Sequence, residues 1–208
     1  MGIRPGSRPG GSAGRWQAWR GSGDMVVWEM IRASGLVAFI LVSTSVFLGI
    51  AVKTRTLDKL MLRALVFEAH RTLSLLAVAF VVLHVLLLLA NRHVSFTLAA
   101  VLLPFASSWR PVAVALGTFS LYLTAALVAS FYVRRFIGHK TWRLMHYLSF
   151  VVWVMALTHG IMAGSDVSTT WVQFLYLAAG CAIGFMLILR LLSPSKTRPA
   201  TESGTHLL

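Results

Sequence analysis

The sequence predicts an all-α integral membrane protein, built as a bundle of about five transmembrane helices. Hydrophobic residues make up 57% of the 208 residues and charged residues only 12%, which is unlike a soluble domain. Five proline-free apolar segments each reach the length of about 20 residues that a helix needs to cross a bilayer. Four histidines lie inside two of these segments, and ionisable side chains in a membrane are usually functional.

The five predicted spans follow one another along the chain with short connections. They cover residues 30–52, 66–90, 112–133, 143–163 and 171–192. Pro104 interrupts a shorter apolar stretch, FTLAAVLLPFASSW, which is too short to cross and suits an interfacial or re-entrant segment. Tryptophans prefer the headgroup layer, and four of them stand at or just before a span: Trp28, Trp109, Trp142 and Trp171.

The two ends of the chain are polar. Residues 1–27 are rich in Gly, Arg and Ser and cannot bury enough apolar surface to fold, so we expect a disordered basic N-terminal arm. Residues 193–208 form a polar C-terminal tail, which leaves residues 28–192 as one membrane domain. The single cysteine, Cys181, excludes a disulfide framework and a Cys-based zinc or iron–sulfur site.

Positive charge exceeds negative charge, with 19 Lys and Arg against 6 Asp and Glu. In so apolar a chain this excess indicates contact with membrane lipid and disfavours nucleic acid as a partner. Basic residues concentrate in residues 53–65, in residues 134–143 and near the C-terminus, regions that an odd number of spans places on one side. The positive-inside rule assigns that side to the cytoplasm, although fewer N-terminal arginines oppose it. We therefore predict a multi-pass cell-membrane protein with its N-terminus outside and its C-terminus in the cytoplasm.

The four histidines form two matched pairs in alternate spans. His70 and His84 are fourteen residues apart, and His146 and His159 are thirteen apart. Both spans begin at the predicted cytoplasmic face, so His70 lies at the depth of His146 and His84 at the depth of His159. Fourteen helical residues rise about 21 Å, which fits two stacked bis-histidine haems in a hydrocarbon core of about 30 Å.

Histidines in a membrane helix can also serve without haem. A metal-transport site is disfavoured, because two levels about 21 Å apart cannot form one coordination sphere. A haem-free membrane scaffold or carrier, in which the histidines make interhelical hydrogen bonds, is the opposing hypothesis. It predicts a colourless protein.

The thirteen-residue interval conflicts with a straight helix. At about 100° per residue, fourteen steps return nearly to the same face, whereas thirteen steps leave two side chains roughly 140° apart. If both His146 and His159 are ligands, the fourth span must contain a π-bulge or a kink.

Small and basic residues accompany the histidines. Gly35 and Gly49 in the first span repeat the fourteen-residue interval, so we expect them to give each macrocycle room, with ordinary helix packing as the alternative. Gly117 and Ser130 echo the interval weakly in the third span. Arginines can pair with haem propionates or serve only as basic membrane anchors; those near the cytoplasmic level are Arg71 and Arg143, and those near the outer level are Arg32 and Arg92.

Four stretches of the chain carry a resemblance to a known family. They are WEMIRASGLVAFILVSTSVFLGI, HRTLSLLAVAFVVLH, LPFASSWRPVAVALGTFSLY and WRLMHYLSFVVWVMALTHGIMAGSD. Over residues 28–192 the chain resembles the ferric reductase-like transmembrane domain family, which includes the membrane parts of NADPH oxidases and ferric reductases and the haem subunit of methionine sulfoxide reductase. The thirteen-residue interval is itself similar to that family's pattern. The resemblance implies that His70, His84, His146 and His159 are axial ligands of two b-type haems.

The resemblance also implies electron flow from a cytoplasmic flavin to an acceptor outside. The oxidases continue into FAD-binding and NADPH-binding domains, whereas no glycine-rich phosphate loop follows the last span here, so flavin or NAD(P)H is expected only through a partner protein. We expect the haem-carrying membrane subunit of an oxidoreductase, reduced by a separate cytoplasmic flavin reductase and oxidised by an extracytoplasmic acceptor. The haem subunit of a periplasmic methionine sulfoxide reductase system and a quinol-linked cytochrome b are the alternatives.

Overall fold

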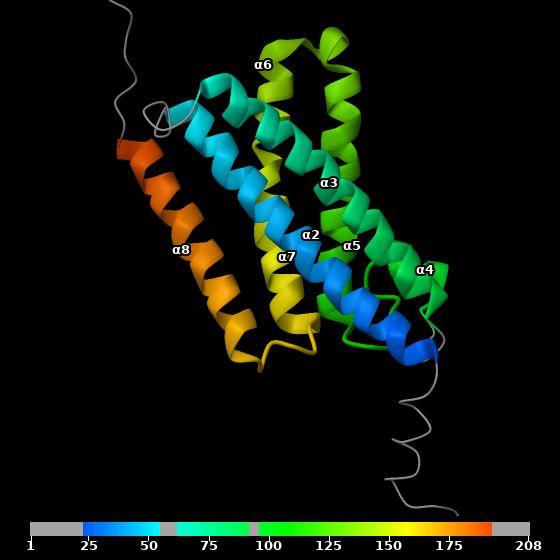
Figure 1. Cartoon of the computed structure of the whole chain (residues 1–208). Helices are drawn as coiled ribbons and strands as arrows, with labels where there is room; N and C mark the ends of the chain where they lie inside the picture. The colour runs from blue at the N-terminus through cyan, green and yellow to red at the C-terminus, as the bar shows by residue number, and fades with distance from the viewer. Residues whose placement is uncertain (1–22, 55–61, 92–95, 193–208) are drawn as a thin grey trace, which may run out of the picture.

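The computed structural model describes residues 23–54, 62–91 and 96–192, and these residues form helices and short connections without a strand. The helices are α2 (Gly23–Thr54), α3 (Arg63–Ala90), α4 (Leu98–Leu102), α5 (Pro111–Tyr132), α6 (Arg134–His146), α7 (Leu148–Ala163) and α8 (Thr170–Leu192) (Figure 1). Five helical stretches are long and apolar enough to cross a membrane, with α6 and α7 together making the fourth. The predicted all-α architecture and its five helices of membrane-spanning length and composition are therefore confirmed.

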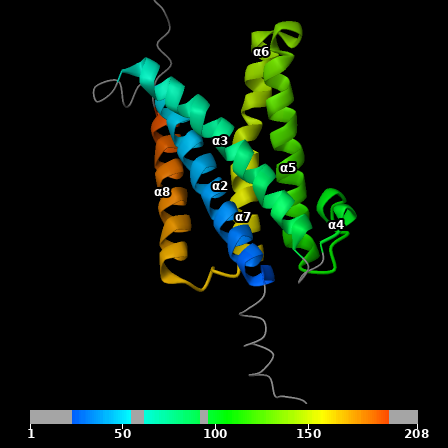
Figure 2. The ribbon, with the colours of Figure 1, turned by 45° about the vertical axis from the view of Figure 1, so that its right-hand side comes forward.

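Helix α2 is the central element of the bundle. It packs along α3 on one side and against α7 and α8 on the other, while α5 packs mainly against α7 (Figure 2). The apolar core lies between α2, α7 and α8 and contains Phe39, Ile50, Trp153, Ile183 and Met186. Because α2 contributes to both contacts, it connects the α3 side of the bundle to the α7 side.

The outward faces of the helices are apolar. Leu75 on α3 is 60% exposed and Leu177 on α8 is 63% exposed, and large exposed hydrophobic side chains also occur on α5 and α7. Such a surface is costly in water and stable in a lipid bilayer. The exposure therefore fits a multi-pass membrane protein.

One end of the bundle is basic, as the charge pattern predicts. The C-terminal end of α2, the start of α3, the connection from α5 to α6 and the C-terminal end of α8 lie at the same end of the molecule in both views (Figures 1 and 2). This end, called the basic end below, contains the described residues Lys53, Arg63, Arg134, Arg135, Lys140, Arg143 and Arg190. The start of α2 and the connection from α7 to α8 lie at the opposite end.

Two boundaries differ from the sequence prediction, and the short interfacial stretch agrees with it. Helix α2 begins at Gly23, so the last residues of the predicted arm 1–27 are helical, while residues 1–22 and the tail 193–208 lie outside the described part. Residues 134–143 are helical in α6, where the chain reverses at Gly138 with φ 78° and ψ 156°. The interfacial stretch contains only the five-residue α4, which is too short to cross.

The fourth span is interrupted next to one of the histidines. Tyr147 separates α6 from α7, and the N–H groups of Tyr147 and Phe150 donate to the carbonyls of Leu144 and Tyr147, both at 3.1 Å. These i→i+3 bonds rotate the chain by about 120° per residue instead of about 100°. Four full turns of an α-helix take about 14.4 residues, so side chains thirteen residues apart do not point in the same direction. A tightened turn rotates the chain further per residue and reduces the angle between them. A tightened turn therefore occurs where a π-bulge or kink is expected.

Candidate functional site

His70 on α3 lies against a glycine and a carbonyl group of α2. Its Nδ1 is 2.8 Å from the carbonyl oxygen of Ser45. A methyl group added to Gly49 would lie 3.2 Å from Cε1 of the His70 ring, so the ring occupies the space that a larger side chain would fill. The Ser45 hydroxyl adds a polar contact at 3.1 Å from Nδ1 and lies 2.6 Å from the Ser74 hydroxyl.

His84 repeats this arrangement one level further along the same two helices. Its Nδ1 is 2.9 Å from the carbonyl oxygen of Ile31, and a methyl group on Gly35 would lie 3.1 Å from its ring. Helices α2 and α3 are antiparallel, so fourteen residues forward along α3 match fourteen residues back along α2. The two histidines and the two glycines therefore keep the same register.

His159 on α7 makes the third copy of the contact, this time with α5. Its Nδ1 is 2.7 Å from the carbonyl oxygen of Ala113, and a methyl group on Gly117 would lie 2.9 Å from its ring. In all three cases the accepting carbonyl belongs to the residue four positions before the glycine. One geometry thus holds three of the four predicted ligands.

The carbonyl contacts decide which ring nitrogen carries the proton. A carbonyl oxygen can only accept a hydrogen bond, so Nδ1 of His70, His84 and His159 is the protonated donor. In a neutral imidazole the remaining nitrogen, Nε2, then has a free lone pair. Nε2 is also farther from the added methyl position than Nδ1 in each ring. Histidines that bind metal are oriented in this way by a second-shell acceptor.

The histidines face one another across helices at two levels. The rings of His70 and His146 have centroids 6.1 Å apart and planes at 85°. His84 on α3 and His159 on α7 stand at the other level, each against its own helix carbonyl. The structure thus brings His70 and His146 together across helices, as expected from the sequence, and the pairing of His84 with His159 stays a prediction.

The separation of the His70 and His146 rings is compatible with two imidazoles on one metal ion. Two imidazole nitrogens on opposite sides of a metal ion, each about 2 Å from it, place their ring centroids roughly 6 Å apart. Within the described residues no group of three or more His, Cys, Asp or Glu could hold a metal ion by itself. A haem iron needs only two axial ligands from the protein, because the macrocycle supplies the other four.

His146 is held differently from the other three histidines. Its ring stacks on Trp142, with centroids 5.3 Å apart and planes at 23°. The guanidinium of Arg134 lies 5.3 Å from the Trp142 ring centroid. Among the described residues, the contacts of the His146 ring are these aromatic ones, without a hydrogen bond to a helix carbonyl.

The four arginines predicted to pair with haem propionates differ in their exposure and in their partners. Arg32 is paired with Asp166 through two hydrogen bonds, of which the one from Nε measures 2.7 Å, and with Glu29 at 2.8 Å. Arg71 is exposed and pairs with Glu68 at 3.4 Å, and Arg143 is exposed on α6. Arg92 lies outside the described residues. The Arg32 pair joins α2 to the connection before α8.

The two glycines of the first predicted span contact histidine rings. A methyl group on Gly35 or Gly49 would meet the ring edge of His84 or His70, which agrees with the helix-packing alternative, and room for a macrocycle stays a prediction. Gly117, which the sequence indicated only weakly, makes the tightest contact of the three. The sequence indicates this contact because the interval between the two glycines equals the interval between the two histidines. The carbonyls that accept the hydrogen bonds cannot be recognised from the sequence.

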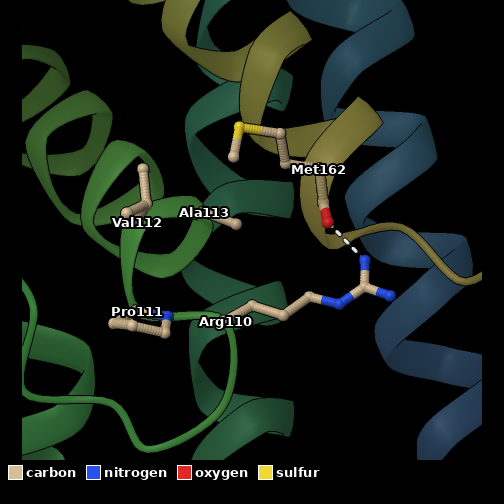
Figure 3. Close-up of a pocket in the computed structure, with 5 residues that line it drawn as sticks. All are labelled: Arg110, Pro111, Val112, Ala113 and Met162. Atoms are coloured by element: carbon tan, nitrogen blue, oxygen red, sulfur yellow. Dashed lines mark hydrogen bonds between the residues drawn. The ribbon is translucent and has the colours of Figure 1, made fainter.

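A pocket of about 270 Å³ adjoins the level of His84 and His159. It is lined by Arg110, Pro111, Val112, Ala113 and Met162 (Figure 3). Arg110 reaches from the start of α5 to donate to the Met162 carbonyl in the last turn of α7. Since Ala113 accepts from His159, this bond helps to fix the two helices that hold one ligand.

Comparison of the chain with protein-family models, curated proteins and solved structures gives no match. The resemblance to the ferric reductase-like family therefore remains a prediction from the sequence.

Proposed function

We propose that the protein transfers electrons across a membrane through two bis-histidine b-type haems, ligated by His70 with His146 and by His84 with His159. The donor is a separate cytoplasmic flavin reductase, and the acceptor lies on the other side. The chain is then the haem-carrying membrane subunit of an oxidoreductase, with its basic end in the cytoplasm. The repeated contact between a histidine, a glycine and a helix carbonyl is the observation that carries this proposal.

The repeated contact supports metal ligation over simple interhelical bonding. A histidine that only joins two helices needs one hydrogen bond, and its other nitrogen has no required direction. Here three rings present the same nitrogen, Nε2, away from the helix that binds Nδ1. The opposing rings of His70 and His146 lie at the separation of about 6 Å that an intervening metal ion requires.

The two histidines of each pair would hold one haem, and haem iron would supply one-electron redox chemistry at that level. The residues of the chain hold the ligands in place. The Nδ1 hydrogen bonds orient the imidazoles and raise the basicity of Nε2, while the apolar helices exclude water. With two histidines of the chain holding each haem, an acceptor would receive the electron without binding to iron.

A spectrum of the purified protein tests the proposal. The full chain, purified in detergent, is expected to show the α band of low-spin b haem in a reduced-minus-oxidised spectrum and two haems per chain in a pyridine haemochrome assay. His84→Ala and His159→Ala should each lose one of the two haems. His139→Ala removes an exposed histidine outside both pairs and should retain both.

Different outcomes point to the alternative functions. A colourless protein supports the haem-free scaffold or carrier and overturns the proposal. One haem per parent chain contradicts transfer through two levels. Reduction by quinol but not by a flavin reductase indicates the quinol-linked cytochrome b, and haem-dependent sulfoxide reduction with a co-purified partner indicates the methionine sulfoxide reductase system.

A further inference from the structure

His146 lacks the contact with a glycine and a helix carbonyl that the other three histidines make. His159 on α7 contacts Gly117 on α5, and the chain reverses between these antiparallel segments at Gly138. Thirteen residues back from His159 is His146, and thirteen residues forward from Gly117 is Ser130. Ser130 therefore stands where the pattern places a fourth glycine.

Ser130 is buried, and its side chain is engaged within its own helix. It is only 2% exposed, and its hydroxyl donates to the Leu127 carbonyl at 2.7 Å. At the other three positions a side-chain carbon would meet a histidine ring at 2.9–3.2 Å. If the register of the other three positions continues, the Cβ and hydroxyl of Ser130 stand where a ring would have to pass to reach the carbonyl four residues earlier, which belongs to Ala126.

Trp142 takes over the orienting role at this position. It lies one turn before His146 on α6 and stacks nearly parallel to the imidazole. Arg134, which precedes the reversal at Gly138, places its guanidinium near both the Phe131 and Trp142 rings, 5.3 Å from each centroid. A cation near an indole ring is attracted to it, so Arg134 holds Trp142 in position.

We propose that Ser130 and Trp142 make the two haem levels unequal, with Trp142 as the positioning residue for His146. This inference rests on the proposed function. The level at the basic end has one ligand whose Nδ1 bonds to a helix carbonyl, whereas the other level has two. Such a hydrogen bond makes an axial histidine more electron-donating and stabilises ferric iron. The haem at the basic end therefore has the higher midpoint potential.

A potentiometric titration followed by the haem spectrum tests the inference. The parent protein should titrate in two separate waves, which His84→Ala and His146→Ala assign to the two levels. Ser130→Gly should lower the potential of the higher wave toward the lower one, because the His146 ring gains access to the Ala126 carbonyl. Ser120→Gly imposes a similar helix cost on α5 and should leave both waves in place.

Trp142 variants provide a second measurement on the same level. Trp142→Leu should broaden the low-spin electron paramagnetic resonance signal of the haem at the basic end and leave the other signal unchanged. Trp142→Phe keeps a stacking ring and should restore the parent signal, and Trp171→Leu removes an exposed tryptophan from α8 as a control.

Three results overturn the inference. They are a parent protein with two haems of equal potential, a Ser130→Gly titration identical to that of Ser120→Gly, and equal effects of Trp142→Leu on both haem signals. Each occurs in a protein that still binds two haems, so the proposed function survives it. A colourless parent protein refutes the proposed function first and this inference with it.

Discussion

Gly117→Ala offers the sharpest single perturbation of the histidine level away from the basic end, which His84 and His159 form and which is the outer level in the proposed orientation. The added methyl group would lie 2.9 Å from both Cε1 and Nδ1 of His159, about 0.5 Å closer than the 3.4 Å at which ordinary contact begins. The imidazole must therefore move away from α5. Since its Nδ1 bond to the Ala113 carbonyl is 2.7 Å long, this movement stretches or breaks the bond that orients the ligand.

Gly117→Ala has opposing effects on the stability of the folded protein. Alanine is favoured over glycine inside a helix by about 1 kcal/mol, whereas overpacking costs about 1–3 kcal/mol and a lost hydrogen bond about 1 kcal/mol. Loss of a second-shell partner lowers metal affinity by about 10- to 100-fold. We expect Gly117→Ala to weaken haem binding at the outer level by that factor while the protein stays folded.

Transfer of haem to an excess of apomyoglobin measures this loss directly. The methyl-to-ring distances predict the strongest effect for Gly117→Ala and weaker effects for Gly35→Ala and Gly49→Ala, where the methyl group would lie 3.1 and 3.2 Å from the ring. An alanine at Gly180 or Gly184 on α8 meets nothing within 4 Å, so these matched controls should retain both haems and gain stability. If Gly117→Ala transfers haem no faster than Gly184→Ala, the ring does not depend on the glycine and the reasoning is wrong.

Two further predictions concern stability, measured as the free energy of unfolding in detergent. Asp166→Ala should cost about 1–3 kcal/mol, because the paired side chain of Arg32 is only 29% exposed, whereas Glu29→Ala, at an exposed carboxylate, should change stability by less than about 1 kcal/mol. Equal losses in the two variants would contradict a role for burial in the Asp166 pair. Trp153→Phe should cost about 1–3 kcal/mol, because the indole N–H donates at 2.9 Å to the buried Ser43 hydroxyl and the smaller ring leaves a gap in the core. A loss below about 0.5 kcal/mol would show that the core closes around the smaller ring.

The helices and their order were predictable because each membrane helix satisfies its own backbone hydrogen bonds and is recognisable by its length and composition. The interruption at Tyr147 was also predictable in kind, since thirteen residues between His146 and His159 do not fit a straight helix. Its form was not predictable, because a tightened turn and a π-bulge both change the angle and the sequence contains no proline there to choose between them.

The start of the first span was placed too late for a related reason. Gly23 and Asp24 have low helix propensity, yet α2 begins there. Propensity is a weak signal beside the tertiary contacts of a long helix. The pair between Arg32 and Asp166 spans 134 residues of sequence and was invisible to local patterns.

By itself, the sequence determined that the chain is a helical bundle with five membrane-length helices. It also determined that the four histidines within these helices lie at two levels. Hydropathy and spacing are one-dimensional quantities, and helical rise converts them directly into depth. Only the tertiary structure decided how each histidine is held, because the orienting carbonyls of Ser45, Ile31 and Ala113 lie 25–53 residues away from their rings. Every residue has a backbone carbonyl, so only helix packing can select which one accepts the proton of Nδ1.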